Sequence, residues 1–155
     1  MTDFSTRAAR EAFLRNHVGA VYDAITDNRT KFVRVEELVF RAAELFPGLI
    51  PSRAEIAAEA GLLQRDKKGL EIDQGILLEH ILGDERAGTH LCHAMLLPRA
   101  DSSEPLAKFT RDGVLDLGAA PLARRGRAVH VDMCNPRYLN AEDQGTIDAV
   151  EIAVD

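Results

Sequence analysis

The sequence predicts a mostly α-helical N-terminal domain, followed by a short β-hairpin and one further helix. Through the first two-thirds of the chain, apolar residues recur at the spacing of amphipathic helices. After Gly113 they alternate with a period of two on either side of Gly126, which is typical of a hairpin. The chain has 155 residues, 46% hydrophobic and 28% charged, which is the composition of a soluble globular protein.

The first helices are predicted from apolar periodicity and from their end signals. Residues 5–25 and 34–46 carry apolar side chains at i, i+3, i+4 and i+7, the second range most regularly. Pro47 and Gly48 end the second helix. Ser52 begins the next helix, because Glu55 stands three residues later and the two side chains can form a capping box around the exposed backbone amides.

Three shorter helices are expected after this point. Asp73 and Asp84 are the predicted N-caps of helices over 74–82 and 85–97, which Gly83 separates and Pro98 ends. A last short helix begins at Ser103 or Pro105 and ends at Gly113.

The segment after Gly113 has the pattern of strands. Residues 114–117 form a short strand candidate, and residues 122–125 and 127–133 flank Gly126 as the two arms of a hairpin. Asn135 and Pro136 end the hairpin, because proline cannot donate a ladder hydrogen bond. We therefore predict a domain boundary at Gly113, with a helical domain over 1–113 and a second domain over 114–155.

The predicted last helix lacks a stop signal. From Glu142 onward apolar residues return to helical spacing, yet no Gly, Pro or basic last turn follows, and Asp155 would lie at the negative end of the helix dipole. A lone hairpin also needs more sheet or a covering helix to be stable. We expect the second domain to be incomplete, so that the chain is truncated within a larger fold; the alternative is a last helix that frays or packs on the helical part.

Charge and cysteine content exclude several classes of protein. Nineteen Lys and Arg against 25 Asp and Glu give a formal charge of −6, which argues against a nucleic-acid binder. No apolar run is long enough for a membrane span, and residues 1–4 do not resemble a signal peptide. Cys92 and Cys134 form no CxxC pair and no disulfide framework, so we expect a reduced, cytoplasmic protein.

A cluster of metal-binding residue types lies in the fifth predicted helix. His90 and His93 can share one helix face, with Cys92 between them and His80 upstream. No second cysteine pair or carboxylate at ligand spacing completes a tetrahedral site. We therefore expect these side chains to pack between helices and predict no metal.

Two motifs near the hairpin resemble the crotonase (enoyl-CoA hydratase/isomerase) superfamily. Asn135-Pro136, followed by Leu139-Asn140-Ala141, is similar in order and spacing to the strand, loop and helix that open the crotonase fold. Segments 28–38, 45–49, 69–75 and 90–95 resemble the helical N-terminal domain of one branch of that superfamily. That branch is the cofactor-independent dihydroxyphenylacetyl-CoA dioxygenases of glycopeptide-antibiotic biosynthesis.

The resemblance implies a fold and a chemistry. The hairpin and last helix would open a crotonase-like α/β core that holds an acyl-CoA, with its thioester carbonyl in an oxyanion hole of two backbone amides. In the dioxygenase branch the resulting carbanion reacts with O₂ without metal or flavin, releasing CoA and an arylglyoxylate. The oxyanion-hole loops of the family lie further along the chain than Asp155, so the isolated chain is expected to be inactive. Relatives are commonly trimer-based, which implies a homo-oligomer.

Four residues are carried over as acyl-CoA contacts; no catalytic residue is identified. Arg137 stands in the loop that runs beside CoA, where a guanidinium could pair with phosphate, or it could equally be part of a solvated turn. Leu139 and Ala141 would supply apolar and backbone contacts, or only pack the loop. Glu142 could bond a phenol of the substrate ring, or act as an ordinary first-turn helix acid. Arg124, Arg125 and Arg127 are expected to be a solvated hairpin turn.

Two other functions remain open on the sequence alone. The chain could be a stand-alone helical interaction module, in which case a partner or a second copy should cover the apolar face of Val129, Val131 and Met133. It could also belong to an enoyl-CoA hydratase or isomerase, since the residues that decide the reaction are not among these 155.

Overall fold

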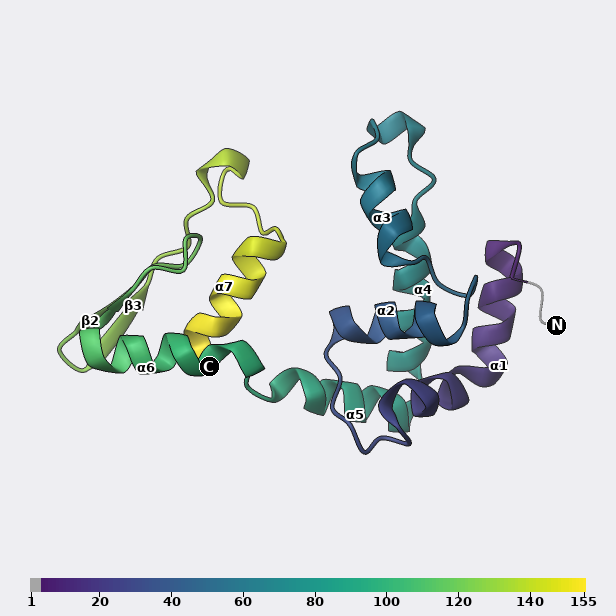
Figure 1. Ribbon diagram of the computed structural model, residues 1–155, viewed down its shortest axis with the longest axis horizontal. Helices are drawn as coiled ribbons and strands as arrows, with labels where there is room; N and C mark the ends of the chain where they lie inside the picture. Colours follow the sequence, from purple (N-terminus) through teal and green to yellow (C-terminus); the bar gives the residue numbers. More distant parts are fainter. Residues whose placement is uncertain (1–3) are drawn as a thin grey trace. The chain divides into compact units, whose positions relative to one another are not determined.

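The computed structural model describes residues 4–155. These residues form two compact units, and the chain passes from the first to the second between Leu96 and Leu97 (Figure 1). Residues 1–3, which belong to the N-terminal segment used above to argue against a signal peptide, lie outside the described residues. Within the described part of the chain, no helix has the length and apolar character needed to cross a bilayer.

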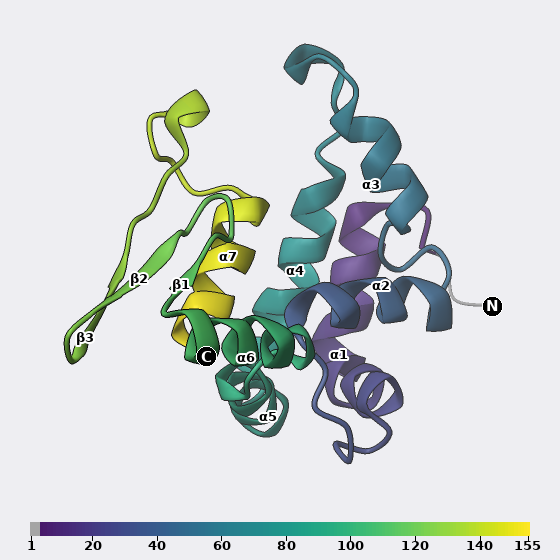
Figure 2. The same cartoon turned by 60° about the vertical axis from the view of Figure 1, so that its left-hand side comes forward.

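The first unit is helical throughout. Its elements are α1 (Arg7–Thr26), α2 (Val35–Leu45), α3 (Arg53–Ala60), a 3₁₀ turn (Gln64–Asp66), α4 (Leu70–Gly83) and α5 (Glu85–Leu96). Helix α1 packs against α2, α4 and α5, and α3 packs against α4 (Figures 1 and 2). The buried core is mainly aliphatic, as a sequence without tryptophan requires, and includes Leu14, Ile25, Leu38, Leu77, Ile81 and Leu91 around the buried ring of Tyr22.

Two of the predicted helix starts are confirmed. The Ser52 backbone amide and hydroxyl donate to the Glu55 carboxylate at 2.8 and 2.7 Å, and the Glu55 amide donates back to Ser52 Oγ, which is the predicted capping box. Asp84 Oδ1 accepts the amides of Arg86 and Ala87 and caps α5.

The predicted start of α4 at Gln74, with Asp73 as its cap, is wrong. The helix begins one turn earlier, after Gly69, whose φ of +73° is a conformation that glycine adopts without strain. Asp73 therefore lies inside the helix, where it forms ion pairs with Arg7 and Arg10 of α1. The cap comes instead from α3, where the Glu59 carboxylate accepts the amides of Lys68 and Leu70.

The second unit combines two helices with a small sheet. It contains a 3₁₀ turn (Ala100–Ser102), α6 (Ser103–Asp112), β1 (Val114–Leu115), β2 (Leu122–Arg125), β3 (Ala128–Val131), a second 3₁₀ turn (Pro136–Tyr138) and α7 (Gln144–Val154). The strands pair antiparallel in the order β1-β2-β3, with Leu122 opposite Val131 and Arg125 opposite Ala128. Gly126 turns the hairpin at φ +63°, as the sequence predicted.

The strands are shorter than the sequence pattern suggested. Strand β1 ends at Leu115 rather than at residue 117, and β3 ends at Val131 rather than at residue 133. The amides of Asp132 and Cys134 still donate across the hairpin, to the carbonyls of Pro121 and Ala119, but outside regular pairing. The apolar side chains of Val129, Val131 and Met133 are exposed in this unit.

The position of the division between the units differs from the predicted boundary. The sequence placed it at Gly113, where helical periodicity gives way to alternation. In the structure α6 contacts β1 and the preceding 3₁₀ turn, so the second unit begins at Leu97. Gly113 is the left-handed cap between α6 and β1, at φ +71°. A helical domain followed by a catalytic core stays a prediction.

Candidate functional site

All four predicted contact residues lie in the segment that joins β3 to α7. Arg137 belongs to the 3₁₀ turn, Leu139 follows it directly, and Ala141 and Glu142 lead into α7. Each of the four side chains is exposed, and Leu139 is 95% exposed. The structure therefore brings the predicted residues together on one short loop and presents their side chains to solvent.

The loop is closed on itself by two asparagines. The Asn135 amide donates to Asn140 Oδ1 at 2.7 Å, and the Asn140 amide donates to the Asn135 carbonyl at 2.8 Å. Asn135 Nδ2 donates in addition to the Ala141 carbonyl at 2.9 Å and to Thr146 Oγ1 at 3.3 Å. We call these four hydrogen bonds the asparagine clasp. Sequence analysis did not single out Asn135 or Asn140 for this role, although asparagine is enriched in left-handed turns.

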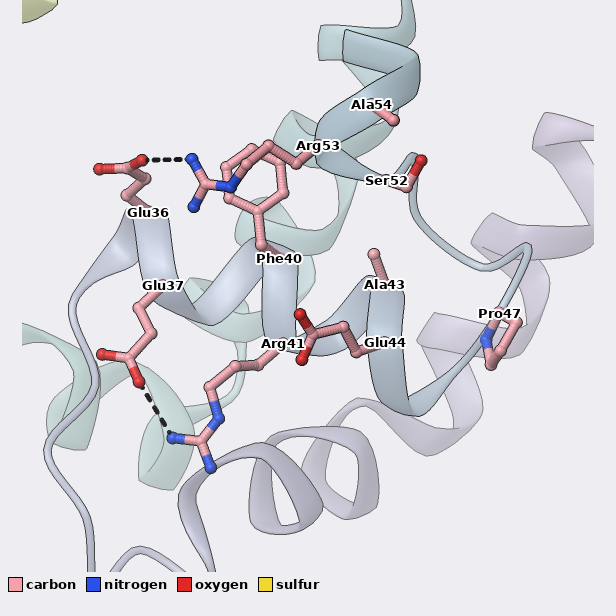
Figure 3. Close-up of a pocket in the computed structure, with 10 residues that line it drawn as sticks. All are labelled: Glu36, Glu37, Phe40, Arg41, Ala43, Glu44, Pro47, Ser52, Arg53 and Ala54. Carbon is pink, nitrogen blue, oxygen red and sulfur yellow. Dashed lines mark hydrogen bonds and ion pairs between the residues drawn. The ribbon is translucent and has the colours of Figure 1, made fainter. Parts of the chain in front are cut away.

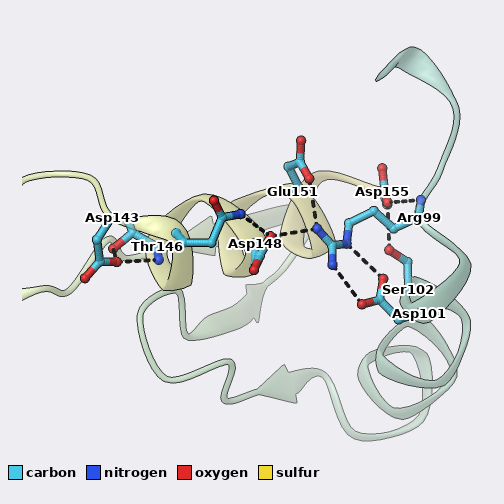
Figure 4. A network of polar contacts seen from close by, with 9 residues as sticks. Arg99, Asp101, Ser102, Asp143, Thr146, Asp148, Glu151 and Asp155 are labelled. Carbon is cyan, nitrogen blue, oxygen red and sulfur yellow. Dashed lines mark hydrogen bonds and ion pairs between the residues drawn. The ribbon is translucent and has the colours of Figure 1, made fainter. Parts of the chain in front are cut away.

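Asp143 links the loop to α7. Its Oδ1 accepts both the amide and the hydroxyl of Thr146 at 2.9 Å, which makes it the N-cap of the helix (Figure 4). The hydrogen bond from the Thr146 amide, followed by the one from its hydroxyl, lowers the pKa of Asp143. Thr146 is buried and bonds both Asp143 and Asn135, so the start of α7 and the clasp share one buried anchor.

The other end of α7 is held by Arg99. Its guanidinium forms a bidentate ion pair with Asp101 at 2.8 and 2.9 Å. It also donates hydrogen bonds to the carboxylates of Asp148 and Glu151 of α7 at 2.8 and 3.0 Å (Figure 4). These carboxylates raise the pKa of Arg99 further above its ordinary value, the contact with Asp101 contributing most. Helix α7 is thus fastened at both ends within its own unit.

Charge around the loop is mostly negative. Arg137 is the only basic residue between residues 132 and 143, which also contain Asp132, Glu142 and Asp143. The hairpin arginines lie outside this segment, exposed at the turn around Gly126, where the Arg124 guanidinium lies over the Phe109 ring at 5.3 Å. Within this segment, Arg137 is therefore the residue that could form an ion pair with a phosphate.

Neither of two hollows in the described part of the chain is lined by a residue of this loop. A groove of about 680 Å³ runs between α2 and α3, where Glu36 pairs with Arg53, Glu37 pairs with Arg41, and the Arg53 guanidinium covers the Phe40 ring at 3.9 Å (Figure 3). Its walls carry three glutamates and two arginines, which does not favour a polyphosphate. A smaller hollow of about 390 Å³ lies in the second unit beside β1 and the start of β2.

The histidines and the cysteine of the zinc hypothesis do not converge. His90 turns inward, with Nδ1 2.9 Å from the Tyr22 hydroxyl and its ring stacked on Phe32. Cys92 and His93 are exposed on α5. Over residues 4–155, no three His, Cys, Asp or Glu side chains are grouped so that they could hold a metal ion.

Comparison with known proteins identifies a similar sequence. No protein-family model matches the chain. The chain is 45% identical over 149 residues to the (3,5-dihydroxyphenyl)acetyl-CoA 1,2-dioxygenase of Amycolatopsis orientalis. The match covers 96% of this chain and 34% of the relative, so the chain spans about a third of that protein's length. The resemblance to dihydroxyphenylacetyl-CoA dioxygenases is thereby confirmed.

Proposed function

We propose that this chain is the N-terminal part of an acyl-CoA dioxygenase of the crotonase superfamily. The enzyme would convert dihydroxyphenylacetyl-CoA and O₂ to the arylglyoxylate and CoA, in the cytoplasm and as a step of antibiotic biosynthesis. The single observation that carries the proposal is the 45% identity over nearly the whole chain to a dioxygenase of that substrate class. The first unit would be the helical leader, and the β3–α7 region would open the catalytic core.

The proposed reaction is balanced without a further oxidant or reductant. Loss of a proton from the carbon next to the thioester gives an enolate, which backbone amides of an oxyanion hole would stabilise. One O₂ forms a bond to that carbon, and its second oxygen atom bonds to the thioester carbonyl carbon as the C–S bond breaks. The O–O bond and the second C–H bond of the former CH₂ carbon then break, which leaves one oxygen atom as the keto oxygen and the other in the carboxylate. The thiol of CoA leaves with a proton. In this proposal neither metal nor flavin takes part.

The loop between β3 and α7 is the proposed contact for the acyl-CoA. Arg137 would pair with a phosphate of CoA, since it is the one cation of an otherwise acidic segment. Leu139 and Ala141 would contact the apolar part of the thioester arm, and Glu142 would accept a hydrogen bond from a ring phenol. The support for these roles is that all four side chains are exposed on one loop that the asparagine clasp closes.

The test is O₂ consumption by the full gene product that contains these residues. With 3,5-dihydroxyphenylacetyl-CoA we expect one O₂ consumed per CoA released, unchanged by EDTA and without added flavin. The 155-residue chain alone should consume none, and measurable O₂ uptake by it would contradict the proposal. Absence of uptake by the full protein, together with hydration of an enoyl-CoA, would establish the hydratase alternative instead.

A binding role is the second candidate, and the exposed apolar face of β3 favours it. Val129, Val131 and Met133 leave this face uncovered in the second unit. If the chain is an interaction module, light scattering should show a stable oligomer or complex of the 155-residue chain. A cooperative monomer that binds no apolar dye would argue against that function.

A further inference from the structure

The loop that carries the proposed acyl-CoA contacts has an unusual backbone. Leu139 and Asn140 adopt left-handed conformations in succession, with φ of 54° and 61°. Asparagine tolerates this region, whereas leucine rarely enters it, because its Cβ crowds the backbone and its side chain offers no hydrogen bond in return. Leu139 gains no burial either, since its side chain is 95% exposed. Something else must hold Leu139 in place.

The asparagine clasp supplies that restraint. Asn135 bonds the loop through three of its groups: its amide to Asn140 Oδ1, its carbonyl to the Asn140 amide, and its Nδ2 to the Ala141 carbonyl. The same Nδ2 reaches Thr146 Oγ1, which is buried and fixed to Asp143. Asn135 thus holds the backbone at and directly after Leu139 and Asn140, and it is itself hydrogen-bonded to Thr146 of α7.

We propose that Asn135 is a positioning residue for acyl-CoA binding. It holds Leu139 and the Ala141 backbone in the shape that meets the thioester arm, so that the loop does not have to be ordered when the ligand arrives. Preorganisation of this kind strengthens binding because it removes an ordering cost. The inference rests on the proposed function, for it names the residue that shapes the proposed contact loop.

The test compares Asn135→Ala with Asn16→Ala in the full-length protein. The two asparagines are matched, since Asn16 Nδ2 also donates to a backbone carbonyl, that of Ala12, at 2.9 Å on the surface of α1. We expect Asn135→Ala to raise the Kd and KM for 3,5-dihydroxyphenylacetyl-CoA about tenfold with kcat nearly unchanged. The change of about tenfold corresponds to the loss of the hydrogen bonds that the Asn135 side chain donates to the Ala141 carbonyl and Thr146 Oγ1. Amide exchange over residues 135–142 should become faster, and Asn16→Ala should change none of these.

A second variant and a second readout keep the outcomes separate. Asn140→Gly tolerates positive φ but removes the acceptor for the Asn135 amide, so it should also speed exchange and weaken binding. Unchanged exchange in Asn135→Ala would overturn the positioning role, as would faster exchange with unchanged Kd. If the wild-type protein consumes no O₂, the proposed function fails, while calorimetric binding of the acyl-CoA still decides the role of Asn135.

Discussion

Asp73 offers a sharp test of how the first unit is held together. Its carboxylate is only 4% exposed and lies 2.8 Å from Arg7 Nε and 2.9 Å from Arg10 Nη2, joining α4 to the start of α1. Asp73→Asn keeps the shape of the side chain but removes its charge and turns one acceptor into a donor that faces a guanidinium. Arg10 Nε is already buried without a hydrogen-bond partner. The substitution would therefore leave the Arg10 guanidinium without the carboxylate charge that balances it as well.

The size of the effect follows from burial. Breaking a buried ion pair by removing one partner costs about 3–5 kcal/mol, and we expect about 3 kcal/mol here because Arg7 is 41% exposed and its share is screened. The matched control is Glu37→Gln, which breaks an exposed i,i+4 pair with Arg41 and should cost under about 0.5 kcal/mol. Urea denaturation at pH 7, followed by helical circular dichroism, measures both.

The effect should also depend on pH. Burial raises the pKa of Asp73, but the hydrogen bonds and charges of Arg7 and Arg10 together outweigh it and lower the pKa below its usual value. Because the folded-state pKa is lowered, the stabilisation from the ionised Asp73 carboxylate is complete above the unfolded-state pKa of about 4. It is lost as the pH falls through the folded-state pKa. The gap between wild type and Asp73→Asn should therefore close in acid. A gap below 1 kcal/mol at pH 7, or one that does not change with pH, would refute this reasoning.

Two further predictions concern packing and ionisation in the same unit. Gly88→Ala should destabilise the fold by about 1–2 kcal/mol, because the added Cβ would lie 2.9 Å from the Leu82 carbonyl oxygen. Gly75→Ala should stabilise it by about 1 kcal/mol, because the space around Gly75 is open and alanine favours the helix. Thermal unfolding that ranks the two variants the other way would contradict this packing. Burial raises the pKa of Tyr22 to about 12, so in a Tyr138→Phe background the phenolate absorbance should appear with a midpoint near pH 12. A midpoint near pH 10 would show that the Tyr22 ring is open to water.

The helices were largely predictable because their signals are local. Ser52 with Glu55, Asp84, and the glycine at 113 stand within a few residues of the ends that they define. Asp73 shows the limit, since it resembles a cap in sequence but pairs with arginines more than sixty residues away. No local pattern reveals such a partner, and the true cap, Glu59, comes from the preceding helix.

The candidate site residues stay a prediction of a different kind. Arg137, Leu139, Ala141 and Glu142 are neighbours in sequence, and their roles were carried over from a resemblance rather than from their spacing. The asparagine clasp that shapes their loop depends on hydrogen bonds between Asn135 and Asn140, five residues apart. The spacing of apolar residues, on which the helices and strands were predicted, carries no information about such bonds. A pair of asparagines bracketing Pro-Arg-Tyr-Leu was the available signal, because asparagine favours turns and left-handed backbone.

The polar contacts of Asp155 have a consequence for the order in which the second unit forms. Its carboxylate accepts the Arg99 amide and the Ser102 hydroxyl, both at 2.7 Å, although 56 residues separate Arg99 from Asp155 (Figure 4). Bringing residues this far apart in the chain together costs loop-closure entropy that a helical turn does not. We therefore expect the hydrogen bonds within α6 and within α7 to form before the contacts of Asp155.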